Sequence, residues 1–315
     1  MRIRPAPHGG VGCARRETCA SGRLPTGESD APGERSYMAG FRTVTAQGAT
    51  IPAIGFGTWT LKDEAATKLV AGAIAAGYRH IDTACMYENE AAVGAGIKAS
   101  KIARNDVFVT TKVWTDDIAD GDLQRSAEAS LKRLGLDQVD LLLIHWPNAA
   151  IPLEGSIKAL CETKKRGLTK HIGVSNFTTA LLDQAVSLTT EPLVANQCEY
   201  HPHLDQTKVI AACKKHGLAF VSYTPLGRGA VGGVMDEPVV VAIAERVKRS
   251  AAQVVLRWHL QQGLAAIPRS QNAERVAANV AVYDFELSSA DMAALAKLAK
   301  PDGRVVNLAF APQWD

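Results

Sequence analysis

The amino-acid sequence predicts an α/β protein whose strands close into a (β/α)8 TIM barrel. Short apolar strands and amphipathic helices alternate along the chain from Phe41 onward, and eight such strand–helix units can be assigned. The alternating region is about 260 residues long and shows no change of composition between its halves, which is typical of one closed barrel. A doubly wound open sheet is the other architecture that this alternation allows.

The ends of the predicted strands favour the barrel over the open sheet. In chain order these ends carry Thr58-Trp59, Asp82, Lys112, His145-Trp146, Ser175-Asn176, Gln197, Tyr223 and Arg269-Ser270. Nearly every strand therefore finishes in a polar or aromatic side chain. A barrel gathers these ends on one face, where barrel enzymes have their active sites, whereas an open sheet would spread them along one edge.

The barrel region is predicted to begin with a β-hairpin that turns at Gln47-Gly48 and closes the bottom of the barrel. The first barrel strand follows at Ile54–Thr58, and a helix over Glu64–Ala76 ends at Gly77. The remaining strands are predicted at Tyr78–Ala84, Val107–Lys112, Val139–His145, His171–Ser175, Leu193–Gln197, Leu218–Tyr223 and Ala265–Pro268. The helices after them are expected to centre near residues 95, 128, 160, 183, 211, 256 and 277, with further helical pieces near 242 and 294.

Composition narrows the class of protein. Hydrophobic residues make up 47% of the 315 residues, enough for a large core, and the net charge is only +3. No long basic run suggests nucleic-acid binding, and no apolar stretch is long enough to span a membrane. The six cysteines are scattered without metal-ligand spacing, which is typical of reduced thiols in the cytoplasm. We expect a cytoplasmic monomer with a small-molecule substrate.

Residues 1–37 differ from the rest of the chain. They are rich in Gly, Pro, Arg and Ser, show no apolar periodicity and lack the apolar core of a signal peptide. We expect this segment to be disordered or to be a non-native extension upstream of a start at Met38. Residues 38–315 are then predicted to form the single barrel domain.

Four side chains at the strand ends suggest carbonyl chemistry. Asp82 and Lys112 end neighbouring strands, His145 ends the next, and Tyr87 lies in the loop after Asp82. A phenol is a poor acid at neutral pH, but a buried ammonium group beside it stabilises the phenolate and lowers its pKa. A carboxylate would hold that lysine charged, and the tyrosine could then protonate a developing alkoxide. The sequence thus predicts reduction of a carbonyl, provided that a hydride source binds alongside.

The chain resembles the aldo-keto reductases over about Phe41 to Asp315. The matching stretches are "GFGTW", "GYRHIDTACMYENE", "TTKVW", "LLLIHWP", "IGVSNF", "NQCEYHP", "SYTPLGRG" and "IPRSQNAERVAAN". The loop after Pro147 and the ending "FAPQWD" resemble the bacterial diketogluconate and methylglyoxal reductase branch. The resemblance implies a catalytic tetrad of Asp82, Tyr87, Lys112 and His145. Tyr87 would be the general acid, Lys112 and Asp82 would tune it, and His145 would position the carbonyl oxygen.

The resemblance also implies a nicotinamide cofactor. Ser175, Asn176 and Gln197 would bind the carboxamide of the nicotinamide, and Tyr223 would stack on its ring. The full set of implied cofactor residues is Thr58, Trp59, Asp82, Ser175, Asn176, Gln197, Tyr223, Pro225, Leu226, Gly227, Arg228, Gly229, Arg269, Ser270, Arg275 and Asn279. The arginines near a 2′-phosphate would favour NADPH/NADP+, with NADH bound more weakly. Two residues depart from the family pattern: Arg269 stands in place of a lysine and Ala278 in place of a glutamate. We therefore expect the preference for NADPH over NADH to be incomplete.

The substrate pocket is expected to contain Trp59, Tyr87, Trp114, His145 and Trp146. Loops near residues 114–120, 147–152 and 305–315 would shape it, and such loops vary freely on a fixed barrel. Candidate substrates are 2-oxoaldehydes, keto sugars or keto acids, and a ketone on a larger metabolite.

A glycine motif after the seventh strand invites a different interpretation. Gly227, Gly229 and Gly232 match G-x-G-x-x-G, the phosphate-binding turn of a Rossmann domain. That turn belongs after the first strand of a βαβ unit, so this match is interpreted as coincidental. The glycines are expected instead to form a loop of exposed N–H groups over the cofactor pyrophosphate, beside Arg228.

Three further alternatives stay open at this point. The Asp82–Lys112 pair could be purely structural, and the protein could be a nucleotide-binding redox sensor with slow turnover. A metal-dependent barrel hydrolase would need several His and carboxylate ligands at the strand ends, where Lys112, Gln197 and Tyr223 stand. His201 and His203 have no third ligand nearby in the sequence, so no metal site is predicted.

Overall fold

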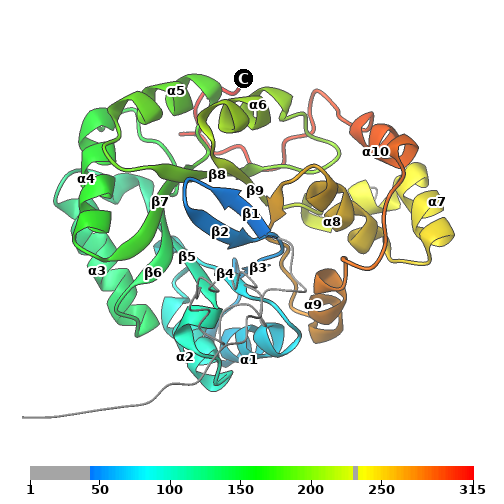
Figure 1. Ribbon diagram of the computed structural model, residues 1–315, viewed down its shortest axis with the longest axis horizontal. Helices are drawn as coiled ribbons and strands as arrows, with labels where there is room; N and C mark the ends of the chain where they lie inside the picture. Colours follow the sequence, from blue (N-terminus) through cyan, green and yellow to red (C-terminus); the bar gives the residue numbers. More distant parts are fainter. Residues whose placement is uncertain (1–42, 230–232) are drawn as a thin grey trace, which may run out of the picture. The chain divides into compact units, whose positions relative to one another are not determined.

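A ring of parallel strands forms the centre of the protein, as the computed structural model shows for residues 43–229 and 233–315 (Figure 1). The strands of the ring are β3 (Phe56–Gly57), β4 (His80–Asp82), β5 (Phe108–Val113), β6 (Val139–Ile144), β7 (Thr169–Ser175), β8 (Leu193–Glu199), β9 (Ala219–Tyr223) and β10 (Ala265–Ala266). Each strand pairs in parallel with the next one along the chain.

The ring closes between its first and last strands. Ile54 forms a parallel bridge with Ala266, and the Gly55 N–H donates to the Ala266 carbonyl at 2.9 Å. The Gly57 N–H donates in the same way to the Pro268 carbonyl at 3.0 Å. These bonds leave no open edge between β3 and β10, so the predicted (β/α)8 barrel is confirmed and the open sheet is excluded.

A hairpin closes the bottom of the barrel, as the sequence predicted. Its strands are β1 (Thr43–Ala46) and β2 (Ala49–Pro52), and both residues of the turn, Gln47 and Gly48, have positive φ. A two-residue turn with positive φ at both positions matches the twist of the strands it joins. Ile51 is fully buried in a cluster with Leu141 and Ala219, which lie near the beginnings of β6 and β9.

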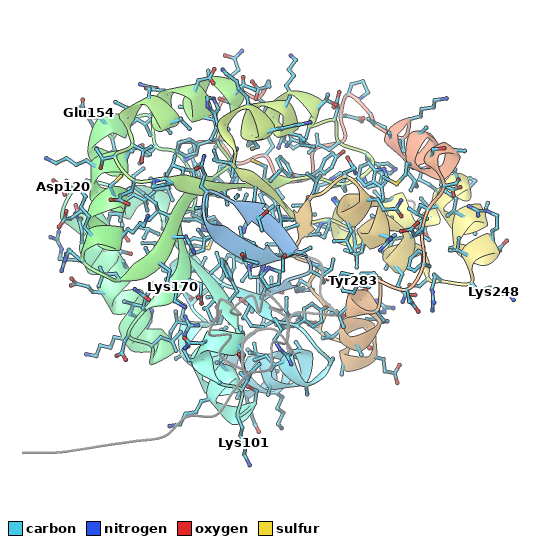
Figure 2. The ribbon with its side chains drawn as sticks, in the orientation of Figure 1. Lys101, Asp120, Glu154, Lys170, Lys248 and Tyr283 are labelled. Carbon is cyan, nitrogen blue, oxygen red and sulfur yellow. The ribbon has the colours of Figure 1, made fainter. Side chains whose placement is uncertain are left out.

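Helices surround the ring and follow the predicted order. They are α1 (Asp63–Ala75), α2 (Glu90–Ala99), α3 (Asp122–Leu134), α4 (Leu153–Lys165), α5 (Thr179–Leu188), α6 (Thr207–His216), α7 (Pro238–Val247), α8 (Ala251–Gln261), α9 (Ala273–Val280) and α10 (Ser289–Ala296). The apolar faces of these helices pack against the outer side of the strands in one large core. Exposed charged residues such as Lys101, Asp120 and Glu154 lie at the outer edge of the helix layer (Figure 2).

Local sequence signals explain where several helices begin. Ser250 and Ser288 each accept a hydrogen bond from the backbone N–H three residues on, and Gln253 and Asp291 complete the two capping boxes. The second of these boxes begins α10. Among the described residues, no helix combines the length and apolar character that a membrane span requires. The interpretation of residues 1–37 as an extension lies outside the described residues.

Candidate active site

A buried ion pair lies at the centre of the site. Asp82 is the last residue of β4 and Lys112 lies near the end of β5, its neighbour in the sheet. Lys112 Nζ donates to Asp82 Oδ1 at 2.5 Å and to the Thr83 carbonyl at 2.8 Å. The side chains of Lys112 and Asp82 are at most 1% exposed. The parallel register therefore brings together two charges that lie 30 residues apart in the sequence.

Tyr87 and His145 complete the predicted tetrad in space. Tyr87 ends the short 3-10 helix η1 (Cys85–Tyr87) after β4, and its hydroxyl lies 3.4 Å from Lys112 Nζ. His145 follows β6, and its ring packs edge-on against Tyr87 with 5.6 Å between the ring centroids. The four residues thus lie together although they come from three different strand ends.

Burial and neighbouring charges shift the pKa values of Tyr87 and Lys112. Burial raises the pKa of Tyr87 above its ordinary value, and the opposing effect of Lys112 does not overcome it. Lys112 lowers the pKa of Tyr87, as expected from the sequence, but burial outweighs this effect and the net shift is upward. Burial lowers the pKa of Lys112, but Asp82 and Tyr87 raise it more, so its net shift is upward.

His145 is neutral at physiological pH. Burial, followed by the charge of Lys112, lowers the pKa of His145 well below its ordinary value. Its Nδ1 is buried and has no hydrogen-bond partner among the described residues. A neutral imidazole carries one N–H, so His145 can donate a hydrogen bond to a carbonyl oxygen without competing for the proton of Tyr87.

A hydrogen-bond chain links the tetrad to the next strand ends. Gln197 Nε2 donates to Asp82 Oδ2 at 2.7 Å, and Ser175 Oγ donates to the Gln197 carbonyl at 2.7 Å. Tyr223 Oη donates to Asn176 Oδ1 at 2.8 Å, and Asn176 Nδ2 donates to the His145 carbonyl at 2.9 Å.

These contacts place the predicted carboxamide-binding groups beside the tetrad, although several of their donors are already engaged within the protein. Asn176 adopts positive φ at this position, which Asn tolerates better than most residues.

A cavity of about 1080 Å³ opens in front of the tetrad. Its wall includes Asp82, Tyr87 and His145, together with Trp59 and Trp146. The predicted cofactor residues that line it, besides Asp82 and Trp59, are Thr58, Asn176, Gln197, Tyr223, Pro225, Leu226, Arg228, Arg269, Ser270, Arg275 and Asn279. Its volume lies just above the usual range for small-molecule sites, which suits an extended ligand.

Some predicted site residues lie behind the wall of the cavity. Lys112 and Ser175 are fully buried beneath it, where Lys112 contacts Asp82 and Ser175 contacts Gln197. Trp114 packs edge-on against the His145 ring at 5.2 Å and does not line the described part of the wall. Gly227 and Gly229 bound a short 3-10 turn after β9, and Arg228 between them does line the cavity.

The glycine motif does not belong to a Rossmann domain. β9, which precedes it, lies between β8 and β10 in a closed barrel, whereas a Rossmann turn follows the first strand of an open sheet. The interpretation of the match as coincidental is therefore confirmed. Gly232 lies outside the described residues.

Sequence reasoning missed several parts of the wall. Met86 of η1, Met235, Gln271 and Asn272 line the cavity, as does the beginning of α8 at Ser250–Ala252. The Ser250–Gln253 capping box indicates in the sequence that a helix begins there. The sequence alone does not show that this end of the helix faces the cavity. Of the three loops expected to shape the pocket, the last contributes Val306 and Leu308, and the other two contribute nothing to the described wall.

Comparison with known proteins identifies the family. Residues 53–300 match the model of the Aldo/keto reductase family. The chain belongs to the aldo/keto reductase family. It is 40% identical over 269 residues to methylglyoxal reductase DkgB of Salmonella typhi, an alignment that covers 84% of this chain and 100% of the relative. An aldo-keto reductase of Mycolicibacterium vanbaalenii is 46% identical over 247 residues, which cover 78% of this chain and 88% of that one.

A solved structure agrees with this assignment. The crystal structure of an aldo-keto reductase from Bombyx mori in complex with NADP superposes with a TM-score of 0.80. It is 34% identical in sequence, and the match covers 85% of this chain and 96% of the silkworm protein. The aldo/keto reductase fold and the DkgB-like branch expected from the sequence are thus confirmed. Among the described residues, no cluster of His, Cys, Asp and Glu could hold a metal ion.

Proposed function

We propose that this aldo/keto reductase family member reduces aldehyde and ketone carbonyls to alcohols with NADPH, and that Tyr87 is the general acid. The observation that carries the proposal is the contact of the Tyr87 hydroxyl with the buried Lys112–Asp82 pair, 3.4 Å from Lys112 Nζ, at the wall of the cavity. A purely structural ion pair would not require an ionisable hydroxyl group next to it at the cavity wall.

Each tetrad residue has a separate task in this mechanism. His145, which is neutral, donates a hydrogen bond that orients the carbonyl oxygen. Tyr87 donates its proton to that oxygen as negative charge develops there. Lys112 stabilises the phenolate that remains, and Asp82 keeps Lys112 charged and fixed in position. Because burial raises the pKa of Tyr87, the phenol remains protonated and able to act as an acid at neutral pH.

The chemistry of the cavity wall fits a dinucleotide phosphate cofactor. Arg228, Arg269 and Arg275 line it, whereas Asp82 is the one carboxylate in the described part of the wall and is paired with Lys112. Such a wall attracts phosphate groups. Arg269, Ser270, Arg275 and Asn279 would hold the adenosine end with its 2′-phosphate, and Ser175, Asn176, Gln197 and Tyr223 would hold the nicotinamide end. When bound, the cofactor supplies the hydride.

The similarity to methylglyoxal reductase DkgB makes 2-oxoaldehydes the first substrates to test. We further propose that the protein acts as a cytoplasmic monomer and that residues 38–315 form its functional domain. The wall formed by Trp59, Trp146 and Leu308 would contact the part of the substrate that lies away from the carbonyl.

Purified protein mixed with NADPH and methylglyoxal tests the proposal through loss of the nicotinamide absorbance. We expect turnover that survives a chelator and stops without the dinucleotide. Tight NADPH binding without turnover across a panel of aldehydes and ketones would favour the redox-sensor alternative. Hydrolysis that requires a metal and no dinucleotide would favour the hydrolase.

A further inference from the structure

The C-terminal segment, residues 303–315, reaches the wall of the cavity although it has no helix or strand of its own. Val306 and Leu308 line the cavity, and Phe310 packs edge-on against Trp146 with 5.7 Å between ring centroids. Figure 1 shows this segment, in red, returning from α10 past α6 towards α5. A backbone without secondary structure needs other hydrogen-bond partners for its N–H and C=O groups. The residues that bind these groups therefore determine the position of this part of the cavity wall.

Glu199 is the anchor beside the cavity. It ends β8, and its side chain is fully buried. Its Oε1 accepts hydrogen bonds from the Val305 N–H at 2.7 Å and from His201 Nε2 at 2.9 Å. Its Oε2 accepts from the Val306 N–H at 2.8 Å. One carboxylate therefore satisfies two consecutive backbone donors that lie more than a hundred residues away in the sequence.

The loop after Glu199 contacts the beginning of this segment and the residues just before it. The Lys300 N–H donates to the His203 carbonyl at 2.9 Å. At Gly303 the chain passes so close that an added Cβ would lie 1.8 Å from the same oxygen, so a larger residue would push the segment off the loop. His201 and His203 of "EYHPH", for which no metal site was predicted, thus support the C-terminal segment, His201 through its ring and His203 through its backbone carbonyl.

The far end of the segment is fixed separately. The Arg304 guanidinium lies 3.6 Å from the centroid of the Trp314 ring, and Trp314 Nε1 donates to Asn307 Oδ1 at 3.0 Å. Asp315 Oδ2 accepts from the Thr179 N–H at 3.0 Å at the beginning of α5. Because Phe310 and Asp315 fix the end of the segment to the barrel, Glu199 chiefly positions residues 305 and 306, which precede Asn307 and Leu308.

Glu199 also borders the proposed nicotinamide site. It is paired in the sheet with Tyr223, whose hydroxyl donates to Asn176. The position of the C-terminal segment is thereby fixed relative to the strand ends that carry the reaction. A loop without such contacts would not be fixed relative to these strand ends.

We propose that Glu199 is a positioning residue that holds Val306 and Leu308 in the cavity wall and so sets which carbonyl compounds the site accepts. This inference rests on the proposed reductase function for its kinetic consequences. Larger aromatic aldehydes such as 4-nitrobenzaldehyde would place their ring against the wall that Val306 and Leu308 form. The much smaller methylglyoxal would react beside Tyr87 and His145 without relying on that wall.

The test replaces Glu199 by glutamine, which keeps the size but exchanges one acceptor oxygen for an NH2 group. That group cannot accept from a backbone N–H, so at least one anchor is lost. We expect kcat/KM for 4-nitrobenzaldehyde to fall by about tenfold, mainly through KM, as for the loss of one buried hydrogen bond. The value for methylglyoxal should change by less than about threefold, since no tetrad contact is altered. Hydrogen exchange at the Val305 and Val306 amides should become faster.

Glu154→Gln makes the same chemical change on the exposed first turn of α4 and should alter neither measurement. Gly303→Ala displaces the segment while leaving Glu199 intact, so it should reproduce the loss of selectivity even if Glu199→Gln fails to fold. If Glu199 acts through the wall, adding Glu199→Gln to Leu308→Ala should cost little more for 4-nitrobenzaldehyde.

Unchanged amide exchange in both Glu199→Gln and Gly303→Ala would overturn the inference, as would full additivity with Leu308→Ala. Equal losses for both aldehydes would also overturn it. Amide exchange needs no turnover, so faster exchange in an inactive protein would sustain the anchoring role and would refute only the proposed function.

Discussion

Lys112 Nζ lies 2.5 Å from Asp82 Oδ1, and neither side chain is more than 1% exposed. A buried pair of this kind adds little net stability, because removing both charges from water offsets most of their attraction. The position of the pair beside the Tyr87 hydroxyl therefore points to a role in catalysis rather than in stability. The two roles differ in what they predict for substitutions of the pair.

Lys112→Met should destabilise the protein by about 3–5 kcal/mol, because it leaves the Asp82 carboxylate buried without its cation. Adding Asp82→Asn should restore much of that stability but none of the turnover. Urea unfolding at neutral pH measures the first effect and NADPH oxidation the second. Lys215→Met, which removes one partner of the exposed Lys215–Asp183 pair, should cost no more than about 1 kcal/mol. Turnover that returned in the double variant would show that the pair is only structural.

Tyr87→Phe should lower kcat by at least about a hundredfold, since it removes the proposed proton donor. NADPH affinity should stay within a few-fold of the original protein, because the ring and its packing against Trp59 remain. Stopped-flow or steady-state NADPH oxidation measures the rate, and fluorescence titration measures the affinity. Tyr78→Phe removes another buried hydroxyl, one that donates to the Val276 carbonyl outside the cavity, and should keep full turnover. Full turnover in Tyr87→Phe would refute the assignment of the acid.

The sequence predicted the barrel and the position of its site because both depend on local signals. Buried parallel strands are read as short apolar runs, such as "VDLLLI" in β6, and each ends at the same face. Asp82, Lys112 and His145 could be brought together from these strand ends alone. Tyr87 was added because it lies only five residues after Asp82.

The remaining features depend on tertiary contacts that no local pattern encodes. The pairing of Glu199 with the amides of Val305 and Val306 joins two segments whose own sequences give no sign of each other. The net pKa shift of Tyr87 depends on burial outweighing the lysine charge, a balance that the identity of the two residues does not reveal. The position of Trp114 behind His145, rather than in the cavity wall, likewise follows from packing against Phe310.

Arg275→Ala should weaken NADPH binding by about tenfold or more and leave NADH binding nearly unchanged, if the guanidinium contacts the 2′-phosphate. Arg275 lines the cavity on the first turns of α9, beside Asn272, whose side chain caps that helix. Fluorescence titration with each cofactor gives the two dissociation constants. Arg125→Ala, on the outer face of α3, should affect neither. Equal losses of affinity for NADPH and NADH would show that Arg275 does not bind the 2′-phosphate.

His259 should make the protein less stable in acid. It is fully buried between Ser222 Oγ and the Pro225 carbonyl, and burial lowers its pKa to about 3. Between pH 6.5 and that value the unfolded chain binds a proton at this residue that the folded protein does not. The free energy of unfolding is therefore highest above this window and falls within it as the pH falls, by up to about 1.4 kcal/mol per pH unit.

His259→Gln should reduce this pH dependence, because glutamine can still bond both neighbours but does not titrate. Some dependence should remain, since burial also lowers the pKa of His80 and His145. Urea unfolding at pH 7.5 and pH 5 gives the difference for each variant. Ser222→Ala removes a hydrogen-bond partner of His259 but keeps the titratable His259 ring. It should therefore lower the free energy of unfolding by about 1 kcal/mol at both pH values. A pH dependence equal to that of the original protein in His259→Gln would mean that this histidine takes up its proton over the same pH range in the folded protein as in the unfolded chain.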